Sequence, residues 1–241
     1  MIPSKFSSGL RPKSMRRRSQ SPLPVKRPHD IIPPIGDALR IIPLGGVEEI
    51  GRNMTAIEFG NDIIVVDAGI LFSNDDTPGI DYILPNTKYL EERKDKIRAL
   101  VITHGHLDHI GGIPFLINRI GNPPVYTREF GALLIKKRQA EFPHLPPLDV
   151  RIVEASDKSL PISPNFKVRF FGLTHSIPDS TGIIIETPYG DIVNTGDVRV
   201  ETENGVPVEK EIEQYKIFKD RNIVLFTMDS TGIDKPGFSP S

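Results

Sequence analysis

Cysteine is absent from this 241-residue chain, and its absence narrows the chemistry that the chain can use. Without thiols there is no disulfide framework, no thiolate zinc finger and no cysteine nucleophile. Any metal ion must therefore be held by histidine, aspartate or glutamate side chains. The lack of cysteine also fits a reducing compartment, and we expect a cytoplasmic location.

Long apolar runs are missing too. No run reaches the roughly 18 to 20 residues that a membrane span needs, so we expect no membrane association. The first residues also lack the apolar core of a secretory signal. With 38% hydrophobic and 25% charged residues, the composition is typical of a globular protein with one sizeable domain.

Acidic residues are lacking from the first 29 residues, which hold eight lysines and arginines and five prolines. The remainder holds 22 basic against 31 acidic residues. We predict that residues 1–35 form a disordered basic extension rich in proline, serine and arginine. Two interpretations stay open, a contact with a polyanion or a merely solvated leader. A third interpretation is an organelle import signal, because the extension is rich in serine and arginine.

From about Leu39 onward, β-rich runs are interspersed with helical segments, which predicts a layered α/β architecture. We expect strands at 39–44, 54–59, 63–66, 97–103, 167–171, 182–187, 191–195 and 222–228, with a hairpin turn at 60–62. We expect helices at 85–96, 109–120, 130–141 and 208–218.

Three histidines and an aspartate fall within six residues, directly after an apolar strand: His104, His106, Asp108 and His109. In a turn that leaves a strand, His104 and His106 can point to one metal ion, while Asp108 and His109 address a second. Imidazole and carboxylate are ligands that zinc accepts when thiolate is lacking. The alternative, a set of surface or capping histidines, does not account for so dense a cluster.

Two later residues, His175 and Asp197, also follow predicted strands. They would add a third histidine for one ion and a carboxylate able to bridge two. Asp67, at a third strand end, is interpreted either as a residue that orients the ligands or as one that stabilises a turn. His29 and His144 are not expected to bind metal.

The series His104-x-His106-x-Asp108-His109, His175, Asp197 resembles the motifs of metallo-β-lactamase-fold hydrolases. Further segments resemble the ribonuclease J family, from about Leu39 to Ser241. They are IPLGGVEEIGRNM at 42–54, DAG at 67–69, GIDY at 79–82, HGHLDHIGG at 104–112, HSIPDS at 175–180, TGD at 195–197, DST at 229–231 and PGFSP at 236–240.

The resemblance implies an α/β fold, the αββα sandwich of the metallo-β-lactamase domain. Residues 36–241 would be the N-terminal portion of that domain, incomplete and ending before a β-CASP insertion. Such a piece would lack the last histidine of the second metal site, and its uncovered sheet edge should make it associate when expressed alone.

The resemblance also implies the chemistry. His104, His106 and His175 would bind one zinc, Asp108 and His109 a second, and Asp197 would bridge both, with manganese as the alternative metal. Asp108, His109 and Asp197 would thereby be catalytic, holding a hydroxide that hydrolyses RNA phosphodiester bonds. Family members act in RNA processing and decay as 5′-to-3′ exonucleases and endonucleases, and we expect RNA as partner and homo-oligomers of the full-length protein.

The sequence departs from the family pattern in places, so other functions stay open. The family's Ser-Asp-Ser-Thr-Asn is here Met228-Asp229-Ser230-Thr231-Gly232, which puts polar contacts from the two flanking positions in doubt. One alternative is another hydrolase on the same fold, such as a thioesterase, lactamase or phosphodiesterase. Another is an inactive fragment that binds metal or RNA. The segments 79–82 and 176–180 favour the nuclease, because they are not general features of the fold.

Overall fold

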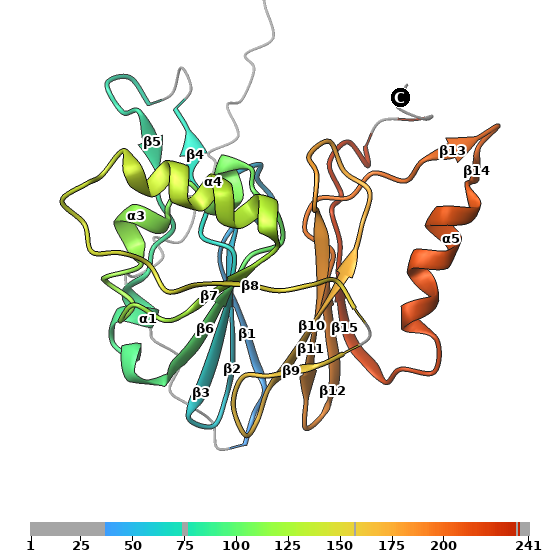
Figure 1. Cartoon of the computed structure of the whole chain (residues 1–241), viewed down its shortest axis with the longest axis horizontal. Helices are drawn as coiled ribbons and strands as arrows, with labels where there is room; N and C mark the ends of the chain where they lie inside the picture. Colours follow the sequence, from blue (N-terminus) through green and yellow to red (C-terminus); the bar gives the residue numbers. More distant parts are fainter. Residues whose placement is uncertain (1–36, 74–76, 157, 235, 237–241) are drawn as a thin grey trace, which may run out of the picture. The chain divides into compact units, whose positions relative to one another are not determined.

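Two β-sheets form the framework of this computed structural model, which describes residues 37–73, 77–156, 158–234 and 236 (Figure 1). The predicted basic extension lies outside the described residues, and so does the motif at 236–240 apart from Pro236. Among those described, no helix has the length and apolar character needed to cross a membrane.

The first sheet has six strands in the order β1-β2-β3-β6-β7-β8. The first three are antiparallel, and β3, β6, β7 and β8 run parallel. The turn at Gly60 and Asn61 joins β2 to β3, with Phe59 paired to Asp62, as the hairpin pattern predicts. Their bounds are β1 Arg40–Gly45, β2 Met54–Phe59, β3 Asp62–Val66, β6 Ile97–Val101, β7 Val125–Thr127 and β8 Val150–Ile152.

The second sheet has five strands in the order β15-β12-β11-β10-β9, and β15 is parallel to β12 while the others are antiparallel. Alternate residues of its apolar runs face the first sheet. The bounds are β9 Leu160–Pro161, β10 Lys167–Gly172, β11 Thr181–Thr187, β12 Gly190–Asn194 and β15 Ile223–Thr227. Two small hairpins pair β4 Leu71–Phe72 with β5 Tyr82–Ile83, and β13 Thr202–Glu203 with β14 Val206–Pro207.

The hydrophobic core has three parts, which define four layers. Between the sheets, Ile64 and Val66 of β3 pack in one cluster with Val168 and Phe170 of β10. Four helices cover the outer face of the first sheet, and α5 with η2 covers the second (Figure 1). The helices over the first sheet are α1 Lys88–Glu91, α2 Leu107–Ile110, α3 Ile113–Leu116 and α4 Glu129–Ala140. Those over the second are α5 Glu209–Tyr215 and the 3-10 turn η2 Lys216–Phe218. A further 3-10 turn, η1 Lys94–Lys96, follows α1.

The helix predicted at 109–120 is wrong in detail, because it begins two residues earlier and divides into α2 and α3. The carbonyl of Asp108 accepts from the backbone amide of Asn53, and the amide of Gly112 donates to Ala68. These tertiary bonds replace the helical bond between Asp108 and Gly112. The helix predicted at 85–96 is likewise reduced to α1 and η1.

Several strands escaped prediction because they are too short to show an alternating pattern. Strands β7 and β8 have three residues each, and β4, β5, β9, β13 and β14 have two. A period of two needs four or more residues to be recognised. Parallel pairing with β6 is what makes β7 a strand.

Candidate metal centre

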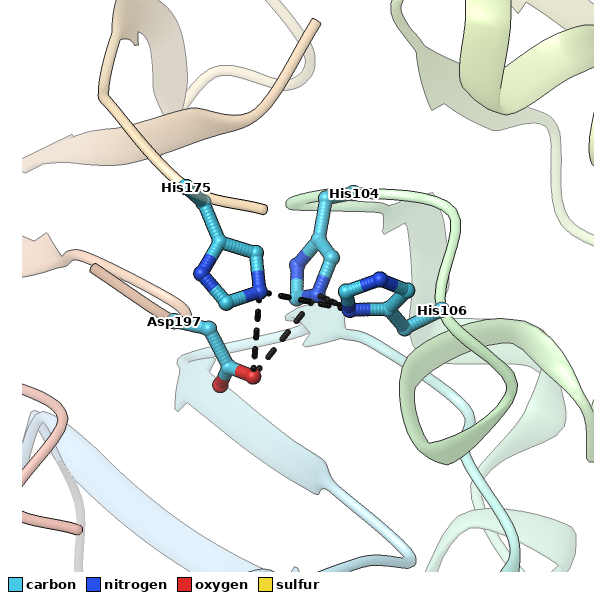
Figure 2. A group of neighbouring side chains, drawn as sticks. All are labelled: His104, His106, His175 and Asp197. Atoms are coloured by element: carbon cyan, nitrogen blue, oxygen red, sulfur yellow. Dashed lines mark hydrogen bonds and ion pairs between the residues drawn. The ribbon is translucent and has the colours of Figure 1, made fainter. Parts of the chain in front are cut away.

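The predicted ligands meet where loops from both sheets converge. His104 and His106 follow β6, His175 follows β10, and Asp197 follows β12. Side chains from these three loops point toward one another in Figure 2. Strand ends of layered α/β folds commonly carry such sites, because side chains from separate segments converge there.

The first group, as we call His104, His106, His175 and Asp197, brings four donor atoms together. Nδ1 of His106 lies 3.0 Å from Nε2 of His104 and 3.2 Å from Nε2 of His175. Oδ2 of Asp197 lies 3.8 Å from Nε2 of His104 and 3.6 Å from Nε2 of His175. These atoms surround a common centre.

The first group fits a small divalent ion in both chemistry and spacing. Donors about 2.0 to 2.1 Å from a tetrahedral ion lie roughly 3.3 to 3.4 Å from one another. The four distances above scatter around that value. Three imidazole nitrogens and one carboxylate oxygen are a donor set that zinc accepts.

The second group consists of Asp108, His109 and again Asp197. Nε2 of His109 lies 3.5 Å from Oδ2 of Asp108 and 3.2 Å from Oδ1 of Asp197. Asp197 therefore turns Oδ2 to the first group and Oδ1 to the second, as a bridging carboxylate must. Three protein donors leave room for a further ligand, which is typical of catalytic zinc sites.

Asp67 holds the ring of His109 in place. Its Oδ2 lies 2.8 Å from Nδ1 of His109, and both residues are buried. The hydroxyl of Thr103 donates to the same carboxylate, and the backbone amide of Thr103 donates to Oδ1 at 2.9 Å. With Nδ1 engaged by Asp67, Nε2 is the nitrogen that faces the second group. Both sequence interpretations of Asp67, ligand orientation and turn stabilisation, have contacts that support them.

Asn53 is a site residue that the sequence analysis did not single out. Its side-chain Nδ2 lies 3.1 Å from Nε2 of His109 and donates to the backbone carbonyl of Asp108 at 3.2 Å. Its backbone amide donates to the same carbonyl. The only sequence signal was its place at the end of the glycine-rich segment 45–53, which has no periodic pattern.

The electrostatics of the site follow from burial and from charge pairing. Burial lowers the pKa of His104, with repulsion from His109 as the second cause. Burial also opposes a charge on His109, but the carboxylates of Asp67 and Asp197 outweigh it and raise the pKa of that ring. Burial works against ionised Asp197 as well, yet the hydrogen bond from His109 lowers its pKa. Asp197 is therefore ionised at neutral pH.

The second group opens into a cleft of about 620 Å³. It is lined by the segment between β1 and β2 and by residues 227–232, at and beyond the end of β15. Asp108, His109 and Asp197 also line it, whereas the three histidines of the first group do not. A molecule in the cleft would thus meet the second group first.

The two remaining histidines, His29 and His144, were not expected to bind metal. His144 is exposed and its ring lies 6.5 Å from that of Phe142, in neither group of donors. His29 lies outside the described residues. All six predicted ligands are brought together, and their metal binding stays a prediction.

Comparison with known protein families matches residues 47–225 to the Metallo-beta-lactamase superfamily. Among curated proteins, the chain is 39% identical over 204 residues to ribonuclease J of Mycoplasma pneumoniae, covering 84% of this chain and 35% of that protein. It is 37% identical over 213 residues to ribonuclease J of Thermus thermophilus, covering 85% of this chain and 36% of that protein. The chain thus spans about a third of the length of these relatives.

Solved structures agree with the fold. A protein of unknown function from Enterococcus faecalis V583 matches with a TM-score of 0.58 and 17% identity, over 84% of this chain and 52% of that one. The short form of human tRNase Z matches with a TM-score of 0.50 and 18% identity, over 81% of each chain. The expected αββα fold is confirmed.

Proposed function

Since this chain belongs to the metallo-β-lactamase superfamily, we propose that it is the metal-binding part of a ribonuclease that hydrolyses RNA phosphodiester bonds. The similarity to proteins named ribonuclease J supports the choice of RNA over a thioester, a lactam or a phospholipid. Because the chain spans about a third of those relatives, we assign the complete activity to the whole protein.

The observation that carries the proposal is the split carboxylate of Asp197. His104, His106 and His175 would hold one ion with Oδ2, and Asp108 and His109 would hold another with Oδ1. Two bound ions would activate a water molecule and offset the negative charge that develops on a phosphoryl group. The protein's part is to fix the donors in place before substrate arrives, which Asp67, Thr103 and Asn53 do for His109 and Asp108.

The cleft supports a polymeric substrate. It is open to solvent beside the second group and is walled by two segments that resemble the ribonuclease J family, 45–53 and 229–231. Backbone amides and the hydroxyls of Ser230 and Thr231 are donors suited to phosphate oxygens. Met228 and Gly232, the two departures from the family pattern, also line the cleft, so a family contact made from those positions would be lost here.

We propose zinc as the metal, because imidazole and carboxylate donors at this spacing suit it, with manganese as the alternative. We propose the cytoplasm as the location. Exonuclease and endonuclease action are both part of the proposal, and homo-oligomers of the whole protein stay a prediction.

The decisive experiment measures metal content by elemental analysis together with nucleotide release from a 5′-monophosphorylated RNA. For the whole protein we expect about two zinc ions per polypeptide and release of nucleotides, both lost in Asp197→Ala and retained in His144→Ala, whose side chain lies outside both groups. Two bound ions with hydrolysis of a thioester or lactam but not RNA would contradict the substrate assignment. Fewer than two ions in the whole protein, without activity, would contradict the proposed two-ion site.

A further inference from the structure

The loop between β10 and β11 carries His175, the only ligand histidine from the second sheet. His104 and His106 come from the first sheet, and among the described residues no strand ladder joins the two sheets. The position of His175 relative to the other two therefore depends on contacts of this loop. A shift of about 1 Å matters at a metal site, because ligand distances are fixed within a few tenths of an ångström.

Two hydrogen bonds within this loop involve Ser180, next to Asp179. The hydroxyl of Ser180 donates to the carbonyl of Ile177 at 3.0 Å, and the amide of Leu173 donates to the carbonyl of Ser180. Pro178 lies between them and fixes its own backbone angle. The position of Asp179 is therefore linked to the positions of the other loop residues.

Asp179 is attached to the helical layer of the first sheet. Its Oδ2 accepts from the backbone amide of Phe130 at 3.2 Å, and its Oδ1 accepts from Arg128 at 3.1 Å. Helix α4 has no capping hydrogen bond from the side chain of Arg128, its own N-cap residue. Asp179 supplies that cap from a distant loop. Asp179 also has a φ of +59°, an unfavourable conformation for a residue with a side chain.

The same helix touches the other ligand loop. A Cβ atom placed on Gly105 would lie 2.4 Å from Cδ1 of Leu134, so α4 packs directly against the turn that carries His104 and His106. Arg128 also donates to the carbonyl of Val153 at 3.2 Å, which fixes the guanidinium on its far side. Helix α4 thus contacts both loops whose histidines form the first group.

We propose that Asp179 and Arg128 act as a clamp that positions His175 for metal binding by tying its loop to the start of α4. Both are positioning residues, because neither supplies a donor atom to the first group. The inference rests on the proposed metal centre and adds the means by which its two halves are held in register. A second tie, from Thr181 to the carbonyl of Thr103, fixes only the base of the loop.

The clamp is tested by Co²⁺ titration of the purified chain, followed through the visible absorption of the bound ion, in four variants. Asp179→Ala removes both contacts. Asp179→Asn keeps an oxygen for the Phe130 amide and tolerates positive φ. Arg128→Gln removes the guanidinium, with its charge and its reach to Asp179, and leaves the Phe130 contact of Asp179 in place. Asp149→Ala is the matched control, because Asp149 also pairs with an arginine, Arg151, but on an exposed surface away from the site. Thermal unfolding of the metal-free proteins is recorded alongside.

We expect Asp179→Ala to weaken Co²⁺ binding at the first group by about 10- to 100-fold and to change its absorption, with smaller losses in Asp179→Asn and Arg128→Gln. The control should match the wild type. A helix-stabilising role alone would lower the unfolding temperature and leave affinity and spectrum intact, which would overturn the clamp. If Asp179→Ala does not fold, the two milder variants decide in the same way.

The readout also separates this inference from the proposed function. Wild-type affinity in all three clamp variants overturns the clamp while the metal centre stands. A wild-type chain that binds no Co²⁺ overturns both. Absence of RNA cleavage by the whole protein, with normal Co²⁺ binding, overturns only the proposed activity.

Discussion

Asp67 and His109 form a buried pair in which Oδ2 of the carboxylate lies 2.8 Å from Nδ1 of the ring. This contact fixes the ring orientation and makes Nε2 a stronger donor toward a metal ion. Asp67→Asn keeps the shape and tolerates the backbone φ of +59° but removes the charge. We expect metal affinity at the second group to fall about 10- to 100-fold in a chelator competition assay. Asp191→Asn, which breaks a similar pair with Arg221, serves as control and should leave affinity unchanged.

Substitution of Asp197 should remove more bound metal than substitution of His175. Asp197→Ala takes away a donor from both groups, so we expect both ions to be lost. His175→Ala takes a donor only from the first group, so one ion should remain. Elemental analysis of the purified variants gives the answer, with His144→Ala as control. Equal metal content in Asp197→Ala and the wild type would remove the bridging assignment.

Gly69 makes the close approach that places Asp108. A Cβ atom added there would lie 1.5 Å from the backbone oxygen of Asp108, a distance that no packing can absorb. We expect Gly69→Ala to destabilise the fold by about 1 to 3 kcal/mol and to weaken the second ion, measured by denaturant titration and metal content. At Gly172 the nearest atom would be 3.8 Å away, so Gly172→Ala is the control. Similar effects of both substitutions would contradict this assignment.

Tyr89 should make stability depend on pH in the alkaline range. Burial and the hydrogen bond to Glu58 raise its pKa from 10.0 to about 12. A raised pKa in the folded state means that the folded protein holds its proton more tightly, so the contribution is complete below pH 10 and is lost as the pH rises toward 12. Urea unfolding across this range should show the loss in the wild type and a smaller slope in Tyr89→Phe. An identical slope in the two proteins would exclude Tyr89 as the source.

The buried side chain of Glu211 should lower the stability of the folded protein. Its side chain is fully buried in α5, and neither carboxylate oxygen has a hydrogen-bond partner within the part of the chain that the structure describes. Burial, and secondarily this carboxylate, raise the pKa of the nearby Tyr215. A buried polar group without a partner costs about 1 to 3 kcal/mol, so Glu211→Leu should raise the free energy of unfolding by a similar amount. The same substitution at the exposed Glu213, Glu213→Leu, is the control. Destabilisation by Glu211→Leu would mean that the carboxylate has a partner, such as an ion or water.

The metal-ligand motif could be predicted from the sequence because four of its residues are close together in the chain. His104, His106, Asp108 and His109 fall within one turn after a buried strand, and any fold that forms the strand keeps them together. Asp197 and His175 could be added because each follows a recognisable strand. Asn53 and Asp179 could not, because their roles depend on where Asp108 and α4 lie in the folded chain.

The same limit applies to the elements. Strands β2, β3, β10 and β11 were predicted nearly residue by residue, since each is a run of five to seven residues with a clear apolar pattern. The division of α2 from α3 was missed because the amide of Gly112 bonds to Ala68, more than 40 residues away. Local periodicity cannot report such a bond.

The sequence by itself determined the layered α/β class, the absence of thiol chemistry and the identity of six candidate ligands. These follow from composition and from short-range spacing, which do not depend on the folded arrangement. Tertiary structure alone decided that Asp197 turns one oxygen to each group of donors and that the second group faces the cleft. Those features depend on how two sheets pack face to face, and that packing is set by many contacts between residues far apart in the chain.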